Sequence, residues 1–382
     1  MEASKPKKKR SLSPEERERL ERQKAAVIRV SGKLVERGLL VRTWGNVSRR
    51  YDRDHFHITP TGLFYDDLTT DKIVSVNMRT LSYKGRIRPS SEMNMHAAIY
   101  QLREDAGFVI HTHQPYASCV SALGEKDIIL PRDLSEMPEM EEVAHVPVAD
   151  YALAGTKQLA EYVADTVQRN PDCVGALIEN HGVVCWGRNE REARTRAEKI
   201  EILSYTYLAT LCHTELQYGI HEGFSSLKDG NDITFRDPGT PERVRRIHRA
   251  IYAKRPDIHA ILHNDAEPER IVSMRYTCID AIFDDFAQII GASVKIPENE
   301  KEDLGKTLSI RSDCNVVFSE GDGAFCLGIN RKEAEYAAKI LNKGCIAQIA
   351  LTRAGIESAL PHLHSIKMHR EYAKRYSKIS SS

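Results

Sequence analysis

Apolar residues in the first half of the chain recur by turns at helical and at strand spacing. Val27, Val30 and Leu34 lie three or four residues apart, which predicts a helix over 26–39 that Gly38 can end. The same reasoning predicts helices over 92–102, 156–167 and 190–211, and strands at 55–59, 73–76, 108–110, 174–178 and 183–186. Strands that alternate with helices in this way indicate an α/β domain.

A polar, turn-forming stretch interrupts this pattern at 223–240 and is predicted to be a linker. We therefore expect a first domain over 25–222 and a second over 241–355. Residues 1–24 are expected to form a disordered basic tail and 356–382 a C-terminal tail.

The two tails carry their own signals. The basic run Lys5–Arg10 is typical of a nuclear localisation signal, although a solvated tail is the favoured interpretation. Ser13 is expected to cap a helix, with Pro14 at its first position and Glu16 closing a capping box. The histidines near the C-terminus are expected to lie on a solvated face (His362, His364 and His369).

Internal similarity relates the second domain to the first. Three segments of the first domain return in the same order, as His96–Tyr100 with His248–Tyr252, Phe108–His113 with Ala260–Asp265, and Gly182–Gly187 with Gly323–Gly328. Chance similarity between two α/β segments would not keep this order, so we interpret the second domain as a truncated, diverged copy of the first.

Two histidines, His111 and His113, follow the apolar run Phe108–Ile110. Side chains at i and i+2 of a strand point to the same face, so both imidazoles can approach one point. His181, in a loop between two predicted strands, can supply a third. Three histidines with an open fourth position form the usual site of a catalytic zinc ion. The alternative is that these are unrelated strand-end and loop histidines.

Composition sets limits on this chemistry. The chain has 382 residues, with 55 Lys and Arg against 54 Asp and Glu, so net charge gives no reason to expect a nucleic-acid or membrane partner. No apolar run reaches the length of a membrane span, and no signal peptide is recognised. Eight scattered cysteines without a C-x-x-C pair are typical of reduced thiols, which predicts a cytoplasmic protein.

Six short motifs identify a family. They are Gly45–Ser48, Ile58–Gly62, Pro89–Glu92, the His111/His113 pair, Tyr151–Thr156 and Asn180–Gly182. In these motifs and their order, residues 25–211 resemble the class II aldolase/adducin family. The resemblance implies an α/β fold, a three-layer α/β/α domain followed in this chain by a truncated copy of the same fold.

The resemblance also assigns roles. It implies that His111, His113 and His181 bind zinc and that Glu92 is the catalytic acid and base. It implies that the substrate phosphate lies against five loop residues (Asn46, Thr61, Gly62, Ser90 and Ser91). Physical chemistry supports this phosphate site, because hydroxyl groups donate hydrogen bonds, Gly62 lets backbone approach an anion, and the predicted helix at 92–102 directs its positive end towards Ser90 and Ser91. Considered alone, Glu92 would be an ordinary early-helix carboxylate.

The implied reaction is zinc-dependent cleavage of a small ketose phosphate into dihydroxyacetone phosphate and an aldehyde. Zinc acts as the Lewis acid and Glu92 moves the proton. Two alternatives stay open. One is a sugar-phosphate epimerase or sugar-acid-phosphate decarboxylase of the same family, although its epimerase branch carries Asp where this chain has Glu92. The other is a non-catalytic, adducin-like scaffold, although such members lack the metal histidines. The resemblance further implies a homo-oligomer.

The second domain is expected to be catalytically silent. His263, Asp265 and Asp322 stand at the three metal positions, and Val244 stands at the position of Glu92. Counterparts of Gly45–Asn46 and Thr61–Gly62 are not recognised. Core or surface roles for the three substituted residues are therefore favoured over a second metal site.

Overall fold

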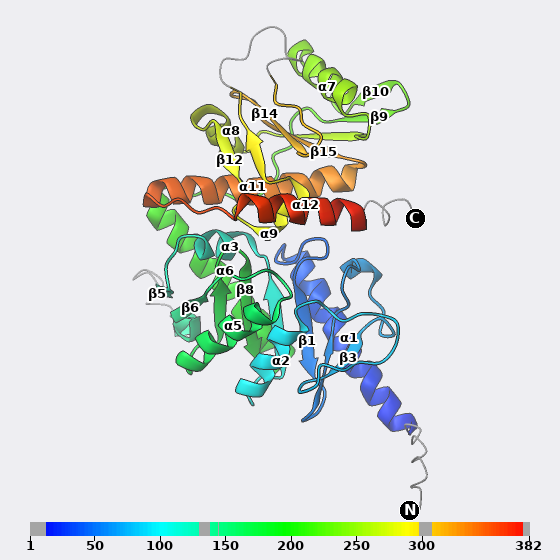
Figure 1. The fold of residues 1–382 in the computed structure, drawn as a ribbon, viewed down its shortest axis with the longest axis vertical. Helices are drawn as coiled ribbons and strands as arrows, with labels where there is room; N and C mark the ends of the chain where they lie inside the picture. The colour runs from blue at the N-terminus through cyan, green and yellow to red at the C-terminus, as the bar shows by residue number, and fades with distance from the viewer. Residues whose placement is uncertain (1–12, 130–137, 144, 298–307, 377–382) are drawn as a thin grey trace, which may run out of the picture.

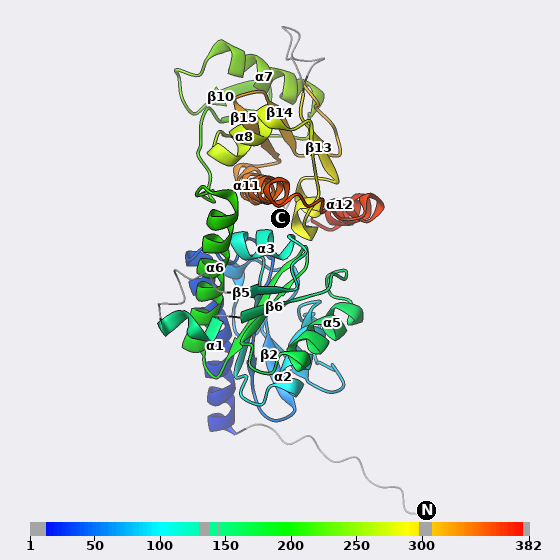
Figure 2. The same ribbon diagram turned by 90° about the vertical axis from the view of Figure 1, so that its left-hand side faces the viewer.

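The computed structural model describes residues 13–129, 138–143, 145–297 and 308–376. The first and second halves are stacked along the long axis of the molecule (Figure 1). Helices α11 (Arg331–Ala354) and α12 (His362–Tyr376) cross between them, as the rotated view also shows (Figure 2). The basic run expected to begin the N-terminal tail lies outside the described residues.

An eight-stranded sheet forms the centre of the first half, in the order β3-β2-β1-β4-β8-β7-β6-β5. Neighbouring strands are antiparallel except β6 and β7, which are parallel. The strands are β1 (Asn46–Arg50), β2 (His55–Ile58), β3 (Val74–Asn77), β4 (Phe108–Thr112), β5 (Asp127–Ile129), β6 (His145–Ala149), β7 (Gly175–Ile178) and β8 (Gly182–Gly187). Short 3-10 helices lie at Tyr65–Asp67 and Pro138–Val143.

Helices cover both faces of this sheet. On one face α1 (Pro14–Glu36), α3 (Pro115–Ser121) and α6 (Glu190–Cys212) enclose an apolar cluster, and on the other α2 (Met93–Leu102) and α5 (Lys157–Arg169) enclose a second. The separation follows from the period of two in each strand, which directs successive side chains to opposite faces. The predicted three-layer α/β/α domain is confirmed.

The second half repeats the middle of that sheet. Its five strands run β10-β9-β11-β15-β14, matching β2-β1-β4-β8-β7. They are β9 (Ser226–Asp229), β10 (Asp232–Phe235), β11 (Ala260–Asn264), β14 (Val316–Ser319) and β15 (Gly323–Gly328). Helix α7 (Glu242–Lys254) stands where α2 does, α8 (Glu267–Arg275) where α3 does, and α11 where α6 does. The prediction of a truncated, diverged copy is confirmed.

The predicted linker at 223–240 is wrong, because β9 and β10 form a hairpin there at the edge of the second sheet. Every second residue of β10 is exposed, so the edge hairpin keeps a polar sequence. The turn-forming residues around Gly230, which has a φ of +56°, join the two strands of the hairpin instead of joining two domains.

Both predicted tails are partly helical. Helix α1 begins at Pro14 with the expected capping box, in which Ser13 and Glu16 each accept the other's backbone N–H. Residues 14–24 are therefore not disordered. At the other end, α12 packs against α9 (Asp284–Ile289), and His369 Nδ1–H donates to the carbonyl of Gln288 at 2.9 Å. His362 and His364 are exposed, as predicted, whereas His369 is half-buried because its side of α12 packs on α9.

One apolar cluster runs through both halves. The cluster that α1, α3 and α6 form on the first sheet continues into α8, α9 and α11. Helix α3 packs directly on α11, where Cys119 Sγ–H donates to the carbonyl of Lys343 at 3.4 Å. Strands β12 (Cys278–Asp280) and β13 (Ser293–Lys295) form a separate two-stranded sheet, and α9 lies between them along the chain. The halves therefore meet through buried apolar side chains.

All eight cysteines are free thiols, and seven of them are buried. None of the helices in the described ranges has the length and apolar character needed to cross a membrane.

Candidate active site

One of the three predicted histidines lies in a strand, and the other two lie just beyond strand ends. His111 lies in β4 opposite Val184 of β8, and His113 follows the end of β4. His181 lies in the tight turn that joins β7 to β8, where Asn180 has a positive φ of +54°. A Cβ atom on Gly182 would collide with the backbone of Thr112, so glycine allows the turn to approach β4.

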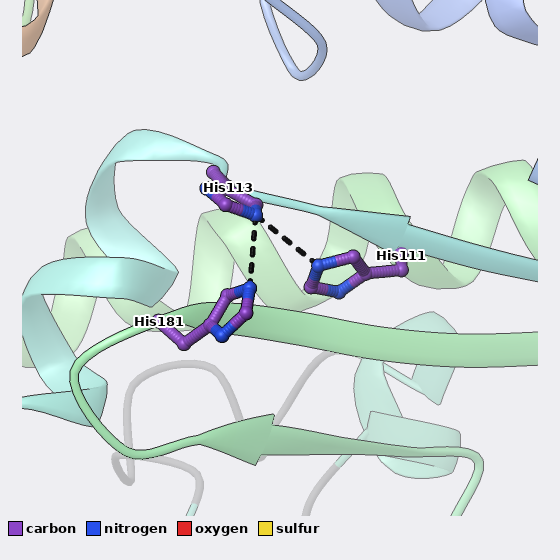
Figure 3. Close-up of side chains that lie close together, drawn as sticks. All are labelled: His111, His113 and His181. Carbon is purple, nitrogen blue, oxygen red and sulfur yellow. Dashed lines mark hydrogen bonds between the residues drawn. The ribbon is translucent and has the colours of Figure 1, made fainter. Parts of the chain in front are cut away.

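Their ring nitrogens converge on one point (Figure 3). His113 Nε2 lies 3.2 Å from His111 Nε2 and 3.0 Å from His181 Nε2. His111 Nδ1–H donates to the carbonyl of Val183 at 2.9 Å, which leaves its Nε2 as a lone pair. Tetrahedral Zn–N bonds of about 2.0–2.1 Å separate neighbouring nitrogens by about 3.3 Å, so the three rings fit a zinc ion. In the described part of the chain, these three histidines are the one group of His, Cys, Asp or Glu side chains whose ligand atoms lie close enough together to hold a metal ion.

Burial favours the neutral form of His111 and His181, which is the form that binds a metal. His111 and His181 are at most 1 % exposed. Desolvation lowers the pKa of His111 below its ordinary value and lowers the pKa of His181 well below it. The charge of Glu92 acts in the opposite direction on both groups, but burial outweighs it.

Glu92 lies beside the histidines, at the N-cap of α2. Its Oε2 is 3.3 Å from His111 Nε2, and its Oε1 is 3.4 Å from His181 Nε2. Burial by itself would raise the pKa of Glu92, but the neighbouring imidazoles and a hydrogen bond from Asn46 outweigh it and lower the pKa to about 2. The carboxylate is therefore ionised, and its Oε1 has no hydrogen-bond partner.

A chain of hydrogen bonds fixes Asn46. Tyr100 and Ser48 hydroxyls lie 2.8 Å apart, and Ser48 Oγ is 2.6 Å from His96 Nδ1. His96 Nε2–H then donates to Asn46 Oδ1 at 2.5 Å, which leaves Asn46 Nδ2–H to donate to Glu92 Oε2 at 2.8 Å. Sequence reasoning did not identify this chain, although the repeated His96–Tyr100 motif was its signal.

The five predicted phosphate residues all line one cavity of about 420 Å³ together with Glu92, His113 and His181. Two loops of this wall are tied together by a bridge between Pro60 and Pro89. Gly62 has a φ of +73°, a left-handed conformation that favours glycine. Ser90 Oγ accepts the backbone N–H of Glu92 at 3.2 Å, so Ser90 also stabilises the turn that precedes α2. Asn46 differs from the other four because its amide already bonds Glu92 and His96.

The second half supplies the opposite wall of the cavity, which sequence reasoning missed. Asp284 and Gln288 of α9 line it, and so do residues of α12 (His364, Lys367, Met368, Glu371 and Tyr372). Asp284 Oδ2 lies 3.6 Å from His181 Nδ1, and Asp285 Oδ2 lies 3.5 Å from His113 Nδ1. Asp284 follows His181 by about 100 positions, and Asp285 follows His113 by about 170. Neither aspartate belongs to a recognised motif, so sequence patterns did not indicate their proximity to the histidines.

The corresponding positions of the second half do not form a metal site within the described residues. His263 Nε2–H donates to the carbonyl of Asp322 at 2.7 Å. Asp265 pairs with His221, and the carboxylate of Asp322 pairs with Arg243. Gly223 does stand at the position of Gly45, whereas Phe224 replaces Asn46.

Comparison with known proteins finds relatives of both halves of the chain. The family model of the class II aldolase and adducin N-terminal domain matches residues 25–208 and, a second time, residues 221–349. The L-fuculose phosphate aldolase of Escherichia coli K12 is 35% identical over 203 residues, which are 52% of this chain and 87% of that protein. The 5-deoxy-D-ribulose 1-phosphate aldolase of Bacillus thuringiensis serovar kurstaki is 30% identical over 198 residues, 50% of this chain and 86% of that protein.

A solved structure of an L-fuculose 1-phosphate aldolase is also similar. It has 31% sequence identity and a TM-score of 0.45, and covers 50% of this chain and 86% of its own.

Proposed function

The chain belongs to the class II aldolase and adducin family, and from this premise we propose that it is a zinc-dependent aldolase. The proposed reaction is reversible cleavage of a small ketose phosphate into dihydroxyacetone phosphate and an aldehyde. The observation that carries the proposal is the convergence of three imidazole Nε2 atoms next to the ionised, partly unpartnered carboxylate of Glu92. The printed names of the two aldolases above support a sugar phosphate as the substrate class.

Metal binding is proposed for His111, His113 and His181. Their lone pairs face one another at 3.0–3.2 Å, which is repulsive unless a proton or a cation lies between them. Neutral imidazole donors suit zinc, and three protein ligands leave a position for substrate. Zinc bound there would supply Lewis acidity towards the carbonyl and hydroxyl oxygens of a substrate.

Glu92 is proposed to exchange the proton. Oε2 accepts the hydrogen bond of Asn46 Nδ2, so Oε1 is the oxygen free to take up a proton and deliver it. In the cleavage direction the hydroxyl group of the departing carbon gives up its proton as it becomes the aldehyde carbonyl, and Oε1 takes up a proton and delivers one to the carbon that keeps the electron pair of the broken bond. In the synthetic direction Oε1 removes the proton from that carbon, and the aldehyde oxygen gains one. Asn46 orients the carboxylate because the hydrogen-bond chain from Tyr100 fixes its amide.

Phosphate is proposed to bind at the two loops that carry Thr61, Gly62, Ser90 and Ser91. These residues offer hydroxyl groups and backbone next to the start of α2, a favourable place for an anion. Asn46 lines the same cavity and can reach a ligand only by sharing the amide that orients Glu92. A homo-oligomer and a cytoplasmic location stay predictions.

The test combines metal content with product analysis. We expect elemental analysis to find about one zinc per chain, and a panel of ketose 1-phosphates to include one that releases dihydroxyacetone phosphate. Zinc without release from any panel member would favour the epimerase or decarboxylase alternative, which product analysis on pentulose phosphates and sugar-acid phosphates would identify. No zinc after reconstitution would overturn the proposal and favour a scaffold.

A further inference from the structure

The start of α9 places two consecutive carboxylates, Asp284 and Asp285, behind the metal histidines of the other half. Asp285 Oδ2 lies 3.5 Å from His113 Nδ1, and Asp284 Oδ2 lies 3.6 Å from His181 Nδ1. The two carboxylates are only 1–2 % exposed. Each therefore faces the ring nitrogen that points away from the point where the Nε2 atoms converge.

Four buried atoms at this contact have no hydrogen-bond partner: His113 Nδ1, His181 Nδ1, Asp284 Oδ2 and Asp285 Oδ1. Such atoms are costly to bury unless they are paired. A small closing movement of about half an ångström or more would bring each Nδ1–H within hydrogen-bond distance of its carboxylate. At His181 the two unpartnered atoms, Nδ1 and Asp284 Oδ2, face each other. At His113, Nδ1 faces Asp285 Oδ2, which also accepts from Lys343, and Asp285 Oδ1 is the atom left without a partner.

Each carboxylate is held from behind by a second group. Lys343 Nζ of α11 donates to Asp285 Oδ2 at 2.5 Å, and Lys343 itself is 1 % exposed. The Tyr151 hydroxyl donates to Asp284 Oδ1 at 2.9 Å. These contacts aim the carboxylates at the histidines rather than leaving them free to turn away.

We propose that Asp284 and Asp285 are positioning residues through which the second half completes the metal site of the first. By accepting Nδ1–H of His181 and His113, they hold both rings in the tautomer whose Nε2 lone pair faces the metal. His111 needs no such carboxylate, because the carbonyl of Val183 accepts its Nδ1–H. The inference rests on the metal site of the proposed function. It goes beyond that function by assigning a task to the second half, whose described residues form no metal site of their own.

Loss of such a partner typically weakens metal binding about 10–100-fold. The first test replaces both members of the buried pair, as Asp285→Leu with Lys343→Met, so that neither charge is left alone. The matched control is Lys343→Met, which keeps the carboxylate behind His113. Asp280→Asn, an exposed carboxylate of the same half, controls for charge alone. Zinc affinity is measured by competition with a chromophoric chelator, and folding by thermal unfolding of the metal-free proteins.

We expect the double variant to bind zinc about 10–100-fold more weakly than Lys343→Met, and Asp280→Asn to match the unaltered protein. Equal zinc affinity in the double variant and Lys343→Met would overturn the inference while leaving the proposed function intact. Absence of zinc binding in the unaltered protein would instead overturn the proposed function.

A second pair of variants tests the same inference if the double variant does not fold. Asp284→Ala removes the acceptor behind His181, whereas Tyr151→Phe keeps that carboxylate and removes only the group behind it. Nitrogen NMR of the metal-free proteins reports which ring nitrogen of His181 carries the proton. We expect Nδ1–H in the unaltered protein and in Tyr151→Phe, and a shift towards Nε2–H in Asp284→Ala. An unchanged tautomer in Asp284→Ala would contradict the inference.

Discussion

His111 and His263 occupy the same position of the two sheets, yet their rings are used in opposite ways. His111 donates through Nδ1 to Val183 and leaves Nε2 free for a metal. His263 donates through Nε2 to Asp322, while its Nδ1 accepts the backbone N–H of Phe224 at 3.1 Å. The same residue type on the same strand therefore serves chemistry in one half and structure in the other.

The second half keeps the buried Ser–His–Tyr hydrogen bonds of the first half but not the residues that these bonds lead to in the active site. Ser226 Oγ lies 2.6 Å from His248 Nδ1 and 3.0 Å from the Tyr252 hydroxyl, as Ser48 does with His96 and Tyr100. In the second half this chain ends at His248 Nε2, which has no partner because Phe224 replaces Asn46. The comparison shows that the hydrogen-bonded core supports the fold even where it no longer leads to a carboxylate.

The largest difference between the halves is expected in metal binding. His113→Ala should reduce zinc from about one per chain to near zero, because two remaining histidines cannot make a three-ligand site. His263→Gln should leave zinc content unchanged, because both nitrogens of His263 already have partners. Elemental analysis after dialysis measures both. Zinc loss in His263→Gln would contradict the prediction that only the histidines of the first half bind zinc.

A second difference is expected at Glu92, whose counterpart is Val244. Glu92→Gln keeps the size of the side chain and its contact with Asn46 but cannot exchange a proton. We expect the rate of dihydroxyacetone phosphate release to fall about 10²–10⁴-fold while zinc is retained. Val244→Ala, on the other sheet, is the control and should leave the rate unchanged. A Glu92→Gln variant with an unaltered rate would remove Glu92 from the mechanism.

The two serines at the centre of the hydrogen-bond chains allow a closer comparison. Ser48→Ala and Ser226→Ala each remove the hydroxyl that pairs with the Nδ1 atom of a buried histidine, so each should lower the free energy of unfolding by about 1–3 kcal/mol. Ser48→Ala should also lower the rate, because only that chain reaches Glu92. Urea denaturation and rate measurements on both variants provide the test, and equal rate losses would refute the distinction.

The smallest expected effect is in the pH dependence of stability. Burial lowers the pKa of His263 to about 4, against 6.5 for the exposed group. The unfolded chain therefore binds a proton between pH 6.5 and 4 that the folded chain does not, so stability is fully present above pH 6.5 and is lost as the pH falls. Relative to its own stability at pH 7.5, His263→Gln should lose about 1 kcal/mol less than the unaltered protein at pH 5.5. Parallel losses in urea denaturation would contradict this.

Local patterns were sufficient for much of the fold and for the metal-binding cluster. The spacing of His111 and His113 defines one face of a strand end, and Gly182 beside His181 marks a tight turn, so short motifs predicted the cluster. The repeated His and Tyr of α2 and α7 likewise predicted the duplicated fold.

Features that depend on long-range packing were not predictable. The hairpin of β9 and β10 is polar because it lies at a sheet edge, and periodicity cannot distinguish such a strand from a linker. The burial of α12 depends on α9, which precedes it by about eighty residues. Asp284 and Asp285 come close to His181 and His113 only because the second half packs on the first.

The apolar cluster that continues from α3 into α11 has a consequence for how the chain folds. Separating the halves would expose apolar side chains of this cluster where α3 packs on α11. Exposed apolar surface on this scale is unfavourable in water, so neither half has a complete interior of its own. We therefore expect the two halves to unfold together, as one cooperative unit built from a duplicated sheet.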